Sequence, residues 1–275
     1  MLSINTNTGA MTALRYLNQT NGGLGGTEKK VSTGLKVASA RDNGATYAIA
    51  QNMRGDIGGG SAIEDSLNRG LSAIDVATGA GESISDLLIE MKAKALAASD
   101  SSLDTASRDA YNQDFLALRD QIEIVVENAS FNGLNLLNGS TTKVTALASS
   151  SGSRRITVMA QNFSFGGSIL ANMSSASTIG NMSAAAAMVS IVSKALVNVD
   201  SALSKLSAGG KKYSIQLGFT SKLIDSLQTG VGNLVDADMA TESANLTALQ
   251  TKQQLGVQAL SIANTSPQII LSLFQ

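Results

Sequence analysis

Apolar residues spaced alternately four and three positions apart constrain the fold of this chain more than any other feature, and they extend almost to both chain ends. We call each such row a seam. Seams are typical of helices that pack lengthwise on other helices. We therefore predict a mainly α fold, a long antiparallel helical bundle or coiled coil. An ordinary domain would fray at its termini, so seams that reach the ends indicate partners outside an ordinary core.

The N-terminal and C-terminal seams are the candidate joining surfaces. The first is interrupted at Asn21 and Glu28, and the second has Ser266 in register. Besides Ala10 and Ala259, the members are Leu14, Leu17, Leu24, Val31, Leu35, Leu255, Ile262, Ile269 and Leu273. Four glycines within 22–26 should make the first helix poorly helical alone, because each costs about 0.5–1 kcal/mol relative to Ala.

Three internal seams predict three further helices. Gly70 and Gly81 stand in the register of the first, and Thr220 is the one polar member of the last. The apolar members are Ile63, Leu67, Ile74, Ala77, Ile84, Leu88, Met91 and Ala95, then Tyr111, Phe115, Leu118, Ile122, Val125 and Ala129, then Tyr213, Leu217, Ile224, Leu227, Val231 and Leu234.

The middle of the chain has a different pattern. Residues 138–183 are rich in Ser, Thr, Gly and Asn. Within them, 143–147 and 155–159 alternate apolar with polar residues, as short strands do, and 149–153 has the composition of a turn. We predict a small β-hairpin at about 141–172. This segment is expected on the outer surface of the protein.

The composition lacks the residue types on which most catalytic and metal sites depend. The chain has no His and no Cys, and its 20 basic and 21 acidic residues give a net charge of −1. The usual general base, zinc site and thiol nucleophile are therefore missing. A nearly neutral chain also has no electrostatic reason to bind nucleic acid. We predict no enzyme, no cofactor and no nucleic-acid partner, and keep an enzyme or ligand-binding bundle as the less favoured class.

Two further absences bear on targeting. No uninterrupted apolar run approaches the ~20 residues of a membrane-spanning helix, and the first 20 residues lack the pattern of a signal peptide. We expect no membrane insertion and no cleaved signal.

Three carboxylates at Asp236, Asp238 and Glu242 could in principle hold a hard cation. Acidic residues in a first helical turn more often complement the helix dipole. We therefore assign no catalytic, cofactor-binding or metal residues.

Several motifs resemble one family, bacterial flagellin of the α-proteobacterial type. They occur in the family's order at both ends of the chain. They are Ile4-Asn-Thr-Asn7, Val31-Ser-Thr-Gly-Leu35, Ala38-Ser-Ala-Arg-Asp-Asn-Gly44, Phe131-Asn-Gly-Leu-Asn-Leu-Leu137, Asp236-Ala-Asp-Met-Ala-Thr-Glu242, Gln254-Leu-Gly-Val-Gln-Ala-Leu260 and Ile270-Leu-Ser-Leu-Phe274. Only 44 residues, Thr141–Ala184, separate the matching regions, so the large outer domains of many flagellins are missing.

The resemblance implies a layered subunit. Residues 1–33 and 236–275 would pair as an inner coiled coil, and residues 34–45 would form a spoke that includes Arg41, Asp42 and Asn43. Residues 46–235 would form the outer helical domain, with helices near 46–100, 104–129 and 185–235 and the hairpin.

The implied function is that of a structural subunit that polymerises with its own copies into the extracellular filament for swimming motility. Implied partners also include the flagellar type III export machinery, a chaperone, and hook-junction and cap proteins. The alternative is a hook–filament junction protein of the same architecture.

The resemblance also bears on a toll-like receptor of animals that binds many enteric flagellins through an exposed helix. Glu90 stands where the family pattern has Arg, and Lys94 stands where it has Leu. One change inverts a charge, and the other places an ammonium where an apolar side chain would be buried. We therefore expect weak or absent contact with this receptor.

Overall fold

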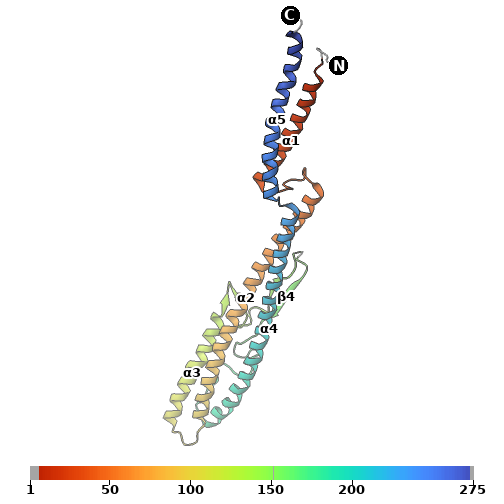
Figure 1. The fold of residues 1–275 in the computed structure, drawn as a ribbon. Helices are drawn as coiled ribbons and strands as arrows, with labels where there is room; N and C mark the ends of the chain where they lie inside the picture. The colour runs from red at the N-terminus through yellow and green to blue at the C-terminus, as the bar shows by residue number, and fades with distance from the viewer. Residues whose placement is uncertain (1–5, 151, 273–275) are drawn as a thin grey trace. The chain divides into compact units, whose positions relative to one another are not determined.

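The computed structural model describes residues 6–150 and 152–272, with side chains described as far as residue 265. The described residues form five helices and two small antiparallel sheets, which confirms the mainly α fold (Figure 1). The helices are α1 (Thr8–Thr33), α2 (Gly44–Ala98), α3 (Thr105–Asn128), α4 (Met182–Val235) and α5 (Met239–Ser272). The expected internal helices thus agree with the observed ones to within a few residues.

The chain divides into two compact units. The terminal unit comprises the residues up to Gly55 and those from Ser226 onward, and the central unit comprises Asp56–Asp225. The helices α2 and α4 therefore each begin in one unit and end in the other. The central unit thus begins after residue 46 and ends before residue 235, the bounds of the outer domain that the family resemblance implied.

The terminal unit contains α1 and α5, which run antiparallel side by side (Figure 1). The side chain of Asn7 caps α1 by accepting the Ala10 N–H at 2.9 Å. The helix ends at Gly34, whose φ of 70° is left-handed and whose N–H donates to the Lys30 carbonyl. Between these caps α1 runs without a break through the glycines of 22–26, so their low helix propensity does not interrupt it here.

The central unit packs α2, α3 and α4 lengthwise around one core (Figure 1). The eight apolar members of the α2 seam, Ile63 to Ala95, are all at most 5 % exposed. In α3, Phe115 and Ile122 are completely buried, as is Tyr213 in α4. The internal seams thus mark the buried faces of these helices.

Two glycines in the α2 seam mark places where α4 approaches closely. A Cβ at Gly70 would overlap the ring of Tyr213 at Cε1, and a Cβ at Gly81 would lie 2.6 Å from Cδ2 of Leu203. These glycines leave room for large side chains of α4. The two glycines in the apolar seam of α2 are therefore part of the packing of α2 against α4.

The predicted hairpin is confirmed as β3 (Lys143–Leu147) paired antiparallel with β4 (Arg155–Met159). Its inner face includes the buried residues Val144, Ala146 and Val158. The hydroxyl of Tyr213 donates to the Ile156 carbonyl at 3.0 Å and fixes the hairpin to α4.

A second, shorter hairpin was not expected. It joins β1 (Ser130–Phe131) to β2 (Leu134–Asn135) through Asn132 and Gly133, both at positive φ. Asn-Gly between two extended residues is the common signal for a two-residue hairpin turn, so this hairpin could have been found in the sequence.

The middle of the chain is more deeply buried than its composition suggested. Outside the hairpin, Phe163, Leu170, Met173 and Ile179 are at most 1 % exposed and belong to the central core. Part of the segment 141–172 therefore belongs to the core of the subunit, and its place on the outer surface stays a prediction. Isolated apolar residues inside irregular backbone have no periodicity, so the sequence pattern does not reveal them.

One helix of the described chain, α4, has an 18-residue window long and apolar enough to cross a membrane, with mean hydropathy 1.6 and 28 % of the window buried. A single such helix is weak evidence, because core helices pass the same test. In α4, Val192, Val199 and Leu206 recur every seven residues and are completely buried in the central core. Packing in the protein core thus accounts for the apolar residues on this buried face of α4.

Candidate assembly interface

The contact between α1 and α5 is a seam in which leucines alternate with small and polar residues. Most of the buried or half-buried positions of the two helices lie three or four apart, and they include Leu17, Leu24, Leu249 and Gly256. A Cβ at Gly256 would lie 3.2 Å from Cδ1 of Leu17. The glycine therefore lets the two helices approach closely at this point. The full set is Ala10, Ala13, Leu17, Thr20, Leu24, Thr27, Lys30 and Val31 of α1 with Glu242, Leu246, Leu249, Gln253, Gly256, Leu260 and Ala263 of α5.

The α1 side of this contact differs in register from the N-terminal seam. Of its members, Leu17, Leu24 and Val31 are buried or half-buried against α5. Between them, however, the structure uses Ala13 in place of Leu14, which is 47 % exposed, and Thr20 and Thr27 in place of Asn21 and Glu28. A helix of 3.6 residues per turn allows either spacing, and contact with α5 selects one.

The C-terminal seam does not face α1. Leu255 is 57 % and Ile262 is 71 % exposed, and both lie on the side of α5 away from its contact with α1. Ile269 lies in α5, but beyond the side chains that are described, and Leu273 lies outside the described residues. The helix α5 thus has two seams, and only the one containing Gly256 is covered within the chain.

Polar contacts fix the antiparallel register of α1 and α5. The Asn7 amide donates to the Ala263 carbonyl at 2.7 Å, and Gln253 Nε2 donates to Asn21 Oδ1 at 2.8 Å. At the other end of the pair, Lys30 Nζ lies 2.9 Å from Glu242 Oε1. The Glu242 side chain is only 14 % exposed, so this ion pair is better shielded from solvent than an ordinary surface pair.

The segment after α1 folds back onto the end of α4. Leu35 and Asp236 form an isolated antiparallel bridge, and the backbone N–H of Lys36 donates to the Val235 carbonyl at 2.8 Å. Val37 and Val235 are buried together in a small core of the terminal unit, which Leu35 and Tyr47 also contact. Leu35, predicted as an assembly residue, is therefore partly covered within the chain.

The three residues predicted for the spoke have different surroundings. Asp42 accepts hydrogen bonds from the Ser39 N–H at 2.9 Å and from the Lys29 ammonium at 3.0 Å. Asn43 caps α2, because its Oδ1 accepts the Thr46 N–H at 3.1 Å. Arg41 is exposed and forms no ion pair within the part of the chain that the structure describes.

The carboxylate of Asp42 should titrate at unusually low pH. The hydrogen bond from Lys29, and then that from the Ser39 hydroxyl, lower its pKa from the ordinary 3.8 to about 2. Because the folded pKa is the lower one, the stability that Asp42 adds is present above about 3.8 and is lost as the pH falls through about 2.

Carboxyl NMR should therefore give Asp42 a midpoint near pH 2. In Lys29→Gln the midpoint should rise toward its ordinary value, because the main cause of the shift is gone. An unchanged midpoint in this variant would show that Lys29 does not hold the carboxylate in solution.

The acidic segment 236–242 is used for structure. Asp238 caps α5 by accepting the Ala240 N–H at 3.0 Å and the Thr241 hydroxyl at 2.8 Å, and these bonds, led by the hydroxyl, lower its pKa. Glu242 lies in the first turn of α5 and pairs with Lys30. Within residues 6–150 and 152–272 no group of three acidic side chains is placed to hold a metal ion.

The two receptor-related positions lie on α2. Glu90 is exposed. Lys94 Nζ lies 2.7 Å from Asp114 Oδ2 of α3 and 5.9 Å from the centre of the Tyr111 ring. The Asp114 hydrogen bond raises the pKa of Lys94. Lys94 is therefore bound mainly to α3, and the expected weak receptor contact stays a prediction.

Sequence reasoning missed part of the exposed apolar surface of the terminal unit. Met11, Tyr16 and Val257 are 59 %, 65 % and 55 % exposed, respectively, and lie outside both predicted seams. Tyr16 lies at the rim of a groove of about 620 Å³ between α1 and α5, where Leu249 and Gly256 also line the wall. A search for apolar residues beside the seam, not only within it, would have found them.

Comparison with known proteins gives matches along nearly the whole chain. The model of the bacterial flagellin N-terminal helical region matches residues 4–142, and that of the C-terminal helical region matches residues 189–274. Flagellin FljK of Caulobacter vibrioides is 52 % identical over 273 residues, which cover 99 % of this chain and 98 % of the relative. A flagellin of Brucella melitensis is 37 % identical over 283 residues, with 100 % of both chains covered. Flagellin C of Rhizobium meliloti is 32 % identical over 323 residues, also with both chains fully covered.

Proposed function

Because the chain belongs to the bacterial flagellin family and is a structural subunit of the extracellular flagellar filament, we propose that the outward faces of α1 and α5 carry its contacts with neighbouring subunits. The family relation extends to the short flagellins of α-proteobacteria. It indicates a structural role rather than catalysis.

The observation that supports this proposal is the uncovered C-terminal seam. Leu255 and Ile262 are more than half exposed on a helix that is already paired through its other face. Met11 and Leu14 of α1 add exposed apolar surface. Contiguous exposed apolar surface usually marks a protein–protein contact. In a polymer of identical subunits, such a surface is covered by further copies.

The proposed layers follow the family pattern. Residues 1–33 and 236–275 form the inner coiled coil, 34–45 the spoke, and 46–235 the outer domain. Leu17, Leu24, Val31 and Gly256 would hold the inner pair together within a subunit. Leu255, Ile262, Ile269 and Leu273 would then contact other subunits. This division assigns different roles to the two seams of α5.

The proposed role also includes an export route and partner proteins. The subunit would leave the cell by the flagellar type III route without a cleaved signal peptide. It would meet a chaperone, the export machinery, and hook-junction and cap proteins. A hook–filament junction protein, the alternative of like architecture, is not favoured, since the relatives matched along the full chain are flagellins.

Amide hydrogen exchange tests whether α1 and α5 depend on assembly. Nearly all residues of their mutual contact are only half-buried, and α1 contains the glycines of 22–26. We therefore expect fast exchange in residues 6–33 and 239–265 of the dilute monomer and slow exchange in the filament. Core residues of α2 such as Ile74 and Ile84 should exchange slowly in both states and serve as the control. Slow exchange across α1 and α5 in the monomer would contradict the proposal.

A further inference from the structure

The exposed face of α4 carries a regular row of apolar and basic side chains. Ile215, Phe219 and Leu223 are 65 %, 59 % and 46 % exposed, and they follow one another at intervals of four residues. Lys211 and Lys222 are exposed on the same side of the helix, and no described residue forms an ion pair with either of them. We call these five residues the α4 ridge. A row of this kind fits a partner that is both apolar and acidic.

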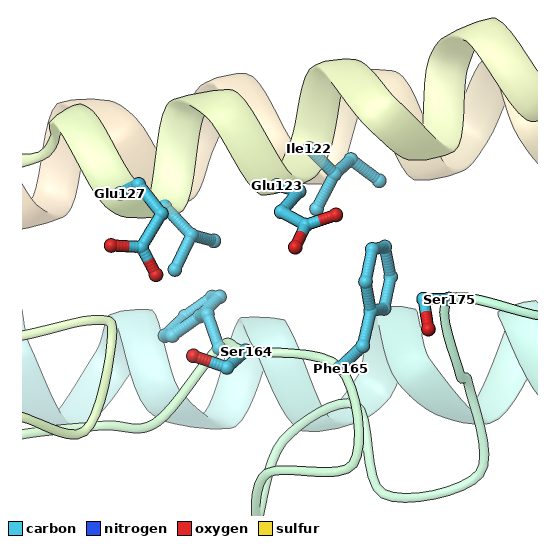
Figure 2. A pocket seen from close by; sticks show the side chains of 8 residues that line it. Ile122, Glu123, Glu127, Ser164, Phe165 and Ser175 are labelled. Atoms are coloured by element: carbon cyan, nitrogen blue, oxygen red, sulfur yellow. The ribbon is translucent and has the colours of Figure 1, made fainter.

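A small acidic pocket lies on α3 of the same central unit. Ile122 and Val126 of α3, with Phe163 and Phe165, form its apolar lining, and the pocket has a volume of about 160 Å³. Figure 2 shows the carboxylates of Glu123 and Glu127 projecting from α3 into the space in front of the segment that holds Phe165. Neither carboxylate forms an ion pair with a described residue.

The size and lining of this pocket suit one long basic side chain. Small-molecule sites usually measure about 300–1,000 Å³, so this pocket is too small for a typical ligand. The methylene stem of a lysine could pack on the phenylalanine rings while its ammonium meets the two carboxylates. Ile124, which follows Glu123 in α3 and is 51 % exposed, supplies apolar surface for a neighbouring helix.

The ridge and the pocket lie on two different helices that are packed into one core. On α4, Tyr213 and Leu217 face the core, and helical spacing puts Ile215 and Phe219 on the other side. On α3, Ile122 belongs to the same core, and Glu123 and Glu127 are exposed at the mouth of the pocket. Because both helices are fixed in this core, one chain cannot join its own ridge to its own pocket. Two different complementary surfaces on one subunit produce an open chain of copies.

From this charge complementarity we propose that the α4 ridge of one subunit packs against the α3 pocket of a second copy. Lys211 or Lys222 enters the pocket between Glu123 and Glu127, and Ile215 and Phe219 cover Ile124. The contact presupposes the filament of the preceding section, but it lies in the central unit and uses no residue of α1 or α5. It is a second interface with its own residues.

Charge reversal provides the decisive test. Lys211→Glu with Lys222→Glu makes both faces acidic, and Glu123→Lys with Glu127→Lys makes both faces basic. Each double variant alone should need at least a tenfold higher protein concentration to polymerise. An equimolar mixture of the two should assemble near the wild-type concentration, and so should the chain carrying all four changes. Lys194→Glu with Lys205→Glu adds the same charge elsewhere on α4 and should assemble normally.

Circular dichroism melting of each monomer shows that the variants fold. The contact is overturned if the double variants assemble alone like the wild type. It is equally overturned if the mixture and the four-fold variant fail while their monomers melt normally.

Cross-linking tests the same contact in the unmodified protein. A carbodiimide should join Lys211 or Lys222 to Glu123 or Glu127, and filaments grown from isotopically light and heavy subunits should show that the link is between copies. If filaments form without this cross-link, the contact between the ridge and the pocket is wrong, while the proposed contacts of α1 and α5 are not affected. Absence of filaments from the unmodified protein would overturn the α1–α5 contact as well.

Discussion

Replacing Leu255 and Ile262 together by Asp should abolish filament assembly while leaving the central unit folded. Both side chains are more than half exposed in the single chain, so the changes remove little packing within it. In the filament each apolar side chain would lose about 1.5–3 kcal/mol of burial, and an unpaired buried carboxylate costs several kcal/mol more. A loss of about 5 kcal/mol or more per subunit raises the required concentration by more than about a thousandfold. Sedimentation of polymer from monomer at increasing concentration measures this directly.

A matched variant separates this seam from the rest of α5. Gln254→Asp with Ser261→Asp adds the same charges one residue earlier, at exposed polar positions of the same helix. This control should assemble at a concentration much closer to that of the wild type. If both double variants assembled equally well, Leu255 and Ile262 would not lie at a subunit contact.

The buried position Leu24 should behave differently from Leu255. It is 8 % exposed and faces α5 within the chain, so Leu24→Asp would break the α1–α5 pair itself. Both changes would prevent assembly, but for different reasons. The structure thus separates two kinds of residue that the sequence pattern placed in one class.

Substituting Ala for Gly70 should destabilise the central unit by about 1–2 kcal/mol. The added methyl would overlap the Tyr213 ring, which is completely buried and whose hydroxyl is bound to the Ile156 carbonyl. Overpacking of this kind costs typically about 1–3 kcal/mol, and the better helix propensity of Ala offsets up to about 1 kcal/mol of that. The melting temperature of the central unit should fall by several degrees.

The control for this change is Gly79→Ala in the same helix. A Cβ there meets nothing within 4 Å, and Gly79 is exposed. This variant should gain about 0.5–1 kcal/mol from helix propensity alone. A loss of stability in Gly70→Ala together with a gain in Gly79→Ala would confirm that Gly70 is needed for the packing of α4 on α2. Equal gains would show that Tyr213 moves aside at no cost.

Local pattern alone was sufficient to predict several elements. Each seam residue of α2 from Ile63 to Ala95 is buried, because a helix with one apolar face has one way to cover it. The strands β3 and β4 have the predicted bounds 143–147 and 155–159, since alternation of period two is specific for a half-buried strand. Resemblance of both chain ends to flagellin supplied the family, which the comparisons confirm.

Tertiary structure alone decided which faces meet. In α1 both Ala13 and Leu14 fit a helical repeat, and the sequence favours the larger residue, but close approach to α5 uses the smaller one. In α5 the face that pairs with α1 has Gly256 between Leu249 and Leu260, whereas Leu255 and Ile262 remain exposed. Both faces carry large apolar residues, so transfer free energy does not choose between them, whereas helix pairing also depends on how closely two backbones can approach. That distance is a property of the pair and is not encoded in either helix alone.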